Sequence, residues 1–269
     1  MKNGKLVKLL LVFILVTGVV SAVFMWGSVT KEKNNKPINI DPETIELVQL
    51  NEPKEGDPIA IVDTTLGEYR FVLYPDRSPN AVKNFTELAE KGYYDNTYVF
   101  HADSGAYSAA GSPKKDGIVN YAEPQEMIER ELDQDLWPFK GAILAMNNQM
   151  KQTLKQKLLG GGTYYNGSRF IAVNTVEMDD ELKQALKDYS SNEELADTFI
   201  KLGGVPNFSQ QMTVIGQTYS GIEVVEKLSK LKTGEADKEG LRTPTEDIMI
   251  NSVKISTYSS EEKPSEAVK

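Results

Sequence analysis

Apolar and polar residues alternate over several short stretches after residue 57. Ile59–Val62 form an apolar run, and Tyr69, Phe71 and Leu73 then alternate with polar residues after a turn at Gly67. A period of two is typical of strands that bury one face. The pattern therefore predicts two strands joined by a tight turn.

Helical spacing occurs at two well-separated places. Ser78 and Pro79 are typical of a helix start, and apolar residues then recur at helical spacing until Gly92. A second helix fits residues 221–230, and a closing strand fits residues 248–255. Many short strands, two helices and no regular strand–helix alternation favour an antiparallel barrel or sandwich.

Two polar segments with helical spacing interrupt the strands, at about 149–163 and about 177–204. The second contains Ser191–Glu194, which has the pattern of a capping box ahead of an apolar helical stripe. We expect both segments to be helical insertions. The first is either an amphipathic helix that binds a partner or a segment that packs its apolar stripe on its own domain.

The amino terminus carries an uncharged apolar run at Leu9–Trp26, with lysines on both sides. Such a run is just long enough to cross a bilayer, and its basic start is typical of an export signal. Cleavage after Ala22 would release the protein, but the run continues past that site, which favours an uncleaved anchor. We therefore expect a signal-anchor at 1–29, a linker at 30–57, and everything that follows on the extracytoplasmic side of the cell membrane.

Charge and composition exclude several classes of function. The chain has no cysteine and one histidine, His101, so disulfides, thiolate metal sites and multi-histidine zinc sites are excluded. Residues 1–36 carry +5 of a total charge of −9, so residues 37–269 carry −14. An acidic domain repels phosphates, so we expect no nucleic-acid partner, and we expect no metal or cofactor.

Five motifs occur in an order that points to one family. They are Phe100-His101-Ala102, Ala106–Gly111, Met146-Asn147-Asn148, Asn166–Ile171 and Asn207–Gly216. In this order they resemble the signature motifs of the cyclophilin-type peptidyl-prolyl cis-trans isomerases. The resemblance covers residues 58–256 without the two insertions, and leaves 257–269 as a polar tail. It implies a mainly β fold, a closed antiparallel eight-stranded barrel capped by two helices, with two helical insertions.

The resemblance is incomplete where the chemistry takes place. Rotation about an Xaa-Pro bond meets a barrier of ~18–20 kcal/mol from amide resonance, and a donor that binds the imide nitrogen in the twisted state lowers it. The family places this donor, an arginine, directly after Phe-His, where this chain has Ala102. Ala109 likewise replaces the family's glutamine. Losing such a donor costs roughly two to three decades in rate.

At several other positions of the family's pocket, this chain keeps side chains that can bind a substrate. The resemblance implies a substrate site made of His101, Tyr107, Asn147, Phe170, Ile171, Phe208 and Met212, with Ala106 as the alternative to Tyr107. His101 is a packing residue in the family, because isomerisation needs no proton transfer. Arg169 takes the place of the family's glutamine in Asn-Gly-Ser-Gln. Arg169 either directs its guanidinium toward the place vacated at Ala102 or pairs with a surface carboxylate.

These features predict a membrane-tethered, extracytoplasmic protein that binds proline-containing segments of exported proteins and is at most a weak peptidyl-prolyl isomerase. The alternative is a non-catalytic interaction module that recognises its partner through the inserted helices. Retained apolar pocket positions favour the first hypothesis, and the alanine at position 102 favours the second.

Overall fold

The computed structural model describes residues 38–120, 128–149, 164–238 and 240–261. Residues 37–148 and 166–269 make up one compact unit. The expected signal-anchor at 1–29 and most of the expected first insertion at 149–163 lie outside the described residues. No helix within the described ranges is long and apolar enough to cross a membrane.

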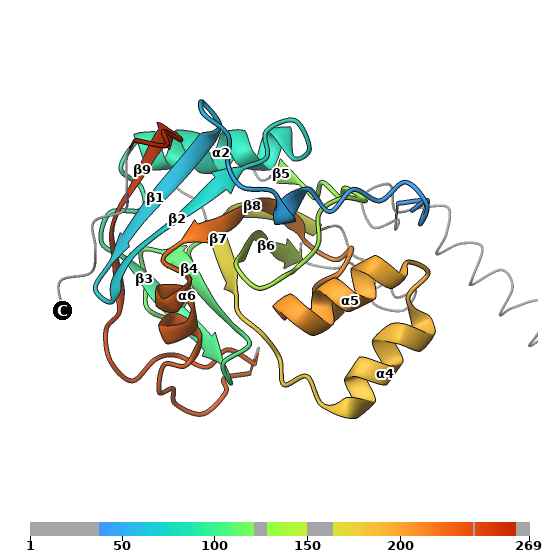
Figure 1. The fold of residues 1–269 in the computed structure, drawn as a ribbon. Helices are drawn as coiled ribbons and strands as arrows, with labels where there is room; N and C mark the ends of the chain where they lie inside the picture. Colours follow the sequence, from blue (N-terminus) through green and yellow to red (C-terminus); the bar gives the residue numbers. More distant parts are fainter. Residues whose placement is uncertain (1–37, 121–127, 150–163, 239, 262–269) are drawn as a thin grey trace, which may run out of the picture. The chain divides into compact units, whose positions relative to one another are not determined.

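Eight antiparallel strands close into a barrel (Figure 1). They are β1 (Pro58–Thr64), β2 (Gly67–Leu73), β3 (Thr97–Asp103), β4 (Tyr107–Ser112), β6 (Ala142–Gln149), β7 (Tyr164–Val173), β8 (Thr213–Ser220) and β9 (Met249–Thr257). Their order is β4-β3-β9-β1-β2-β8-β6-β7, and pairing of β4 with β7 closes the ring. The short β5 (Ile128–Glu129) adds to β7. The prediction of a closed eight-stranded antiparallel barrel is confirmed.

The seam between β4 and β7 explains one glycine of the second motif. Gly111 has a φ of 90°, and a Cβ at this position would lie 2.6 Å from the carbonyl oxygen of Ser168. Only glycine allows both this backbone conformation and the close approach of the two strands. The register of the seam places Ala109 opposite Ile171 and Ala110 opposite Phe170.

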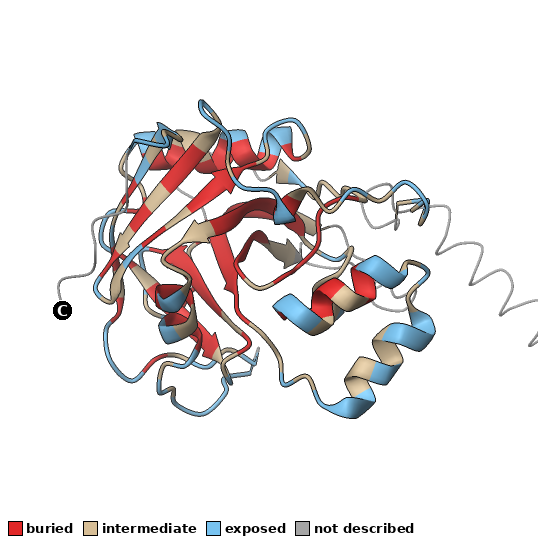
Figure 2. Cartoon of the chain, in the orientation of Figure 1, coloured by how far each residue is buried: buried red, intermediate tan, exposed pale blue. Residues whose placement is uncertain are grey.

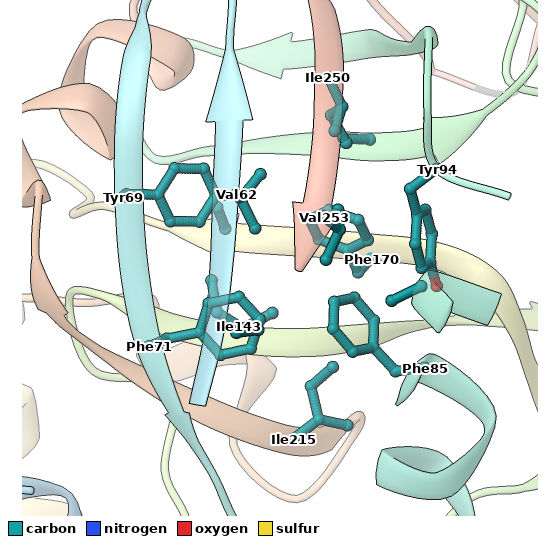
Figure 3. Packing of buried hydrophobic residues seen from close by; sticks show 14 of the residues in the cluster. Val62, Tyr69, Phe71, Phe85, Tyr94, Ile143, Phe170, Ile215, Ile250 and Val253 are labelled. Atoms are coloured by element: carbon teal, nitrogen blue, oxygen red, sulfur yellow. The ribbon is translucent and has the colours of Figure 1, made fainter. Parts of the chain in front are cut away.

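Two helices cap the barrel as expected, α2 (Pro79–Glu90) and α6 (Ile222–Ser229). Pro79 opens α2 at a position where a helix does not need the missing N–H. Phe85 of α2 and Val225 of α6 are both buried in the apolar cluster that fills the barrel. The close view in Figure 3 shows Phe85 pointing toward Phe170 and Ile215 inside the barrel.

The second insertion forms two helices, α4 (Asp180–Tyr189) and α5 (Glu193–Leu202). Asp179 caps α4 by accepting the N–H of Leu182 at 2.7 Å. Asn192 caps α5 by accepting the N–H of Leu195 at 2.8 Å, so the cap lies one residue after the Ser191 expected from the pattern. No residue of α4 is buried (Figure 2), whereas α5 buries one face against the domain.

The folded unit begins before the boundary expected near Pro58. The 3-10 helix η1 (Val48–Leu50) follows Ile45 and Leu47, which pack on the cluster of Trp137 and Phe139. Gln49 is buried and donates to the Trp137 carbonyl at 2.9 Å. Much of the described part of the expected linker is therefore attached to the barrel, because its scattered apolar residues find a partner surface that a sequence pattern does not show.

Candidate functional site

The outer face of the barrel carries a second apolar cluster over β3, β4, β6, β7 and β8. Successive residues of a strand point to opposite faces, so β7 sends Phe170 into the interior and Ile171 outward. On β4, Ala110 and Ala109 divide in the same way. The chain therefore has an interior core and a separate apolar surface that share the same strands.

Large, half-buried side chains gather on this outer cluster. We call Tyr107, Met146, Ile171, Phe208 and Met212 the outer apolar patch. Ile171 is buried at its base, and the other four are partly exposed. The Tyr107 and Phe208 rings meet edge-on with their centres 5.1 Å apart. The patch combines Tyr107, Ile171, Phe208 and Met212 of the expected site, and Ala106, the alternative to Tyr107, is buried in the same outer cluster.

A short 3-10 helix, η2 (Pro206–Phe208), positions the phenylalanine of the patch. The Phe208 N–H donates to the Val205 carbonyl at 2.9 Å, and Val205 is itself buried in the outer cluster. Gln210 follows with a φ of 57°, which turns the chain back into β8. Phe208 is thus held in place by a tight turn that begins at the buried Val205.

His101 lies under the patch and supports Tyr107. It is 2% exposed, and its Nδ1 accepts the backbone N–H of Arg242 at 2.7 Å. The neutral ring must then carry its proton on Nε2, which donates to the Tyr107 hydroxyl at 3.2 Å. Burial lowers the pKa of His101 and raises the pKa of Tyr107 to about 12, so both remain neutral near pH 7. His101 is a positioning residue in this arrangement.

Ala102 is buried beside the loop that contains Arg242. It is 1% exposed, and its N–H donates to the Arg242 carbonyl at 3.2 Å. The Arg242 side chain lies near Asp103, with Nε 3.9 Å from Oδ1. The loop that carries Arg242 is thus a neighbour of the position where the family has its arginine. Sequence reasoning missed Arg242, because about 140 residues of sequence separate it from the Phe-His motif and no pattern marks it.

Arg169 is buried and held by neutral oxygens. Its Nη1 donates to the Gly117 carbonyl at 2.8 Å, its Nε to Asn120 Oδ1 at 3.2 Å, and its Nη2 to Asn148 Oδ1. The guanidinium carbon lies 5.8 Å from the centre of the Phe100 ring. Only 9% of Arg169 is exposed. The arrangement ties the loop after β4 to strands β6 and β7.

The remaining expected site residues have different surroundings. Asn147 donates through Nδ2 to the Gln211 carbonyl at 2.6 Å, so it bridges β6 and the turn before β8. Asn148, its neighbour, is the one that contacts Arg169. Phe170 is 2% exposed inside the barrel and meets Phe85 at right angles. Phe170 therefore does not line the outer patch, contrary to expectation, because it alternates with Ile171.

The patch offers apolar contact, and its chemistry is limited to binding and hydrogen bonding. No group of three or more acidic or histidine side chains that could hold a metal ion occurs among the described residues. The hydroxyl of Tyr107 is a polar group of the patch itself, and Asn147 follows Met146 of the patch along β6. Such a surface can accept a compact apolar ring and hold it without covalent chemistry.

Comparison with known proteins agrees with the fold and the motifs. The profile of the family described as "Cyclophilin type peptidyl-prolyl cis-trans isomerase/CLD" matches residues 59–158. Proteins named "Putative peptidyl-prolyl cis-trans isomerase" from Staphylococcus saprophyticus and Staphylococcus haemolyticus are 28% and 27% identical over 208 residues. These alignments cover 77% of this chain and 96% of each relative.

Solved structures show the same fold. A cyclophilin type peptidyl-prolyl cis-trans isomerase of Cryptosporidium parvum matches with a TM-score of 0.53 and 19% identity, over 76% of this chain and 99% of that one. Its structure in the presence of the dipeptide Ala-Pro matches with a TM-score of 0.50 and 20% identity, over 74% and 99%. The matched profile, the curated relatives and the shared fold agree in showing a cyclophilin-type domain in this chain.

Proposed function

We propose that this protein is a membrane-tethered, extracytoplasmic folding factor that binds proline-containing segments of exported proteins and isomerises them slowly. The observation that carries the proposal is the outer apolar patch, in which Tyr107 and Phe208 stand half-buried over Ile171. A partly exposed apolar surface on a well-packed base gains free energy when a ligand covers it. The Cryptosporidium relative studied with Ala-Pro supports proline as the ligand.

Slow catalysis follows from the residue at position 102. Ala102 has no side-chain donor for the imide nitrogen of the twisted proline bond. Binding through the patch stabilises ground state and transition state alike, whereas the donor acts only in the transition state. Removing one such donor costs about two to three decades in rate. The patch can therefore keep its affinity while the rate falls.

Arg169 contributes by positioning the site and not by donating to the substrate. Three of its nitrogens already donate to protein oxygens, and the side chain is 9% exposed. Turning it toward a ligand would leave the Gly117 carbonyl and Asn148 Oδ1 without this donor, at a cost of roughly 1–3 kcal/mol for each unsatisfied group, whereas Asn120 Oδ1 would still accept the Arg169 backbone N–H. Its contacts support a role in holding the loop after β4 against Phe100.

The tether is proposed from the sequence at Leu9–Trp26 and its flanking lysines. An uncharged run of this length partitions into a bilayer, and the lysines before it favour retention of the amino terminus in the cytoplasm. Fractionation of cells, with sequencing of the mature amino terminus, tests the point. Membrane-bound protein with an intact amino terminus supports an anchor, and a soluble protein that starts at Val23 contradicts it.

A second candidate function rests on the insertion. Helix α4 buries none of its residues, and Tyr189 at its end is 88% exposed. Such a surface suits a non-catalytic module that captures a partner through α4 and α5. This candidate predicts partner binding that does not depend on proline or on the outer apolar patch.

An isomerisation assay on the full-length chain distinguishes the two candidates. We expect the wild type to accelerate cis-to-trans conversion of an Ala-Pro peptide slightly, and Phe208→Ala to weaken peptide binding. Ala102→Arg should raise the rate of the folded protein by on the order of 100-fold with little change in affinity, because the donor acts only in the twisted state. A chain that neither binds nor isomerises the peptide supports the interaction module instead.

A further inference from the structure

A second apolar cavity lies between the insertion and the barrel, next to the outer apolar patch. Its volume is about 400 Å³. Its apolar lining includes Trp137, Leu182, Leu186, Tyr189, Phe199 and Pro206. A space of this size holds one or two large side chains of a ligand. The cavity exists because α4 stands away from the barrel, whereas α5 packs on Trp137 and Phe139.

The cavity and the patch meet at η2. Asn207 and Ser209 line the cavity, and Phe208 between them belongs to the patch. Neighbouring Cα atoms lie about 3.8 Å apart, and an extended peptide spans about 3.3–3.6 Å per residue. A peptide with its proline on Phe208 therefore reaches the cavity within a few residues.

One polar group in the cavity wall lacks a partner. Trp137 is 6% exposed, and its indole Nε1 has no acceptor among the described residues. A buried donor without an acceptor is costly, and a shift of the indole toward a peptide carbonyl in the cavity would supply the missing acceptor. Trp137 thus places a hydrogen-bond donor without a partner among the apolar side chains of the lining.

The electrostatic surroundings specify the flanks of a ligand. Residues 177–204 contain eight acidic residues and three lysines, a net charge of −5. Glu193 and Glu194 begin α5. They follow closely after Ser190 and Ser191, which line the cavity. A ligand with basic residues beside its apolar side chain complements this charge, and one with acidic residues is repelled.

We propose that this cavity is a second subsite for the same client polypeptide, which binds an aliphatic or aromatic side chain located two to four residues from the proline and flanked by basic residues. The inference rests on the proposed function, because it assumes that the proline occupies the patch. It makes the insertion a determinant of substrate choice. The client class is then an exported segment that combines a proline with a nearby large apolar residue.

Peptide binding to the full-length chain tests this subsite. One labelled peptide has a single proline among alanines, and others add a leucine or phenylalanine at two to four positions on either side, with a neighbouring lysine. We expect at least one extended peptide to bind about tenfold tighter, as burial of one large side chain allows. Because the chain has two tryptophans, Trp26→Phe leaves Trp137 as the sole tryptophan, and its emission should change with the extended peptide alone.

Matched variants on α4 test whether the gain in affinity comes from the cavity. Ala185→Lys places a charged chain in the cavity lining and should remove the tenfold gain without changing affinity for the proline-only peptide. Gln184→Lys adds the same charge at an exposed position outside the lining and should keep the gain. Trp137→Phe removes the indole donor and should reduce the gain severalfold; because the buried ring also becomes smaller and the variant loses stability, its affinity is measured well below its unfolding midpoint.

The possible results distinguish failure of the subsite from failure of the proposed function. If the proline-only peptide binds and no extension improves it, or if Ala185→Lys keeps the gain, the subsite is refuted and the proposed function stands. If an extended peptide binds equally well after its proline is changed to alanine, the link to the patch is refuted and the interaction module is favoured. If no peptide binds, both proposals fail.

Discussion

The interior of the barrel and the outer apolar patch are built from the same strands but end in different environments. Inside, Phe85 and Phe170 have their ring centres 5.6 Å apart, and both are fully enclosed (Figure 3). Outside, Tyr107 and Phe208 are 5.1 Å apart, and both remain partly exposed. Similar ring contacts therefore serve two purposes. The enclosed pair stabilises the fold, and the half-exposed pair keeps apolar area that a ligand can still cover.

Truncation of the interior ring should have the largest effect. We expect Phe170→Ala to lower the free energy of unfolding by about 3–5 kcal/mol, because it removes buried contacts and leaves a cavity. Chemical denaturation of the full-length chain measures the change. Phe208→Ala, the same truncation on a half-exposed ring of the patch, is the matched control and should cost about 1 kcal/mol or less. Equal losses at the two positions would contradict the division into interior and patch.

Arg169 lies between the two regions, and its loss should rank second. Arg169→Met keeps the length of the side chain but leaves the Gly117 carbonyl and Asn148 Oδ1 without this donor. We expect the free energy of unfolding to fall by roughly 2–4 kcal/mol, since the separate penalties do not add fully. The isomerisation rate of the folded variant should stay close to that of the wild type. A loss of rate with unchanged stability would instead identify Arg169 as the donor to the substrate.

The sequence predicted the barrel well because strand alternation and motif order are local properties. Phe100-His101 and Asn166–Ile171 marked the strands on which the site lies, and the insertion at 177–204 was recognised from helical spacing. The contacts that define the site were not predictable in the same way. Arg242 is hydrogen-bonded to His101, and Asn120 to Arg169, only in the folded chain. No spacing in the sequence predicts these contacts.

Truncation in the patch should affect binding more than stability. Phe208→Ala removes a side chain that is already half-exposed, so we expect a loss of about 1 kcal/mol or less in the free energy of unfolding. Affinity for a proline peptide should fall about tenfold, because the ring is one wall of the patch. Titration of a labelled peptide measures this effect, and Gln211→Ala, at an exposed neighbouring position, is the control. Unchanged affinity in Phe208→Ala would place the ligand elsewhere.

The smallest expected effect is a pH dependence of stability that comes from His101. His101 is the only histidine, and burial lowers its pKa below the usual value of 6.5. The unfolded chain therefore takes up a proton near pH 6.5, whereas the folded protein does so only at lower pH. In that window the unfolded state binds more protons, so stability falls as the pH is lowered, by at most about 1.4 kcal/mol per pH unit.

The His101→Asn variant isolates this contribution, because asparagine retains an acceptor for the Arg242 N–H but does not titrate. We expect the free energy of unfolding of the wild type to decline between pH 6.5 and 5, and that of the variant to decline less. The same fall in pH should weaken peptide binding to the wild type, because a protonated His101 no longer accepts the Arg242 N–H and its support of Tyr107 is disturbed. Parallel pH profiles for the two proteins would show that His101 fills space under the patch without controlling it.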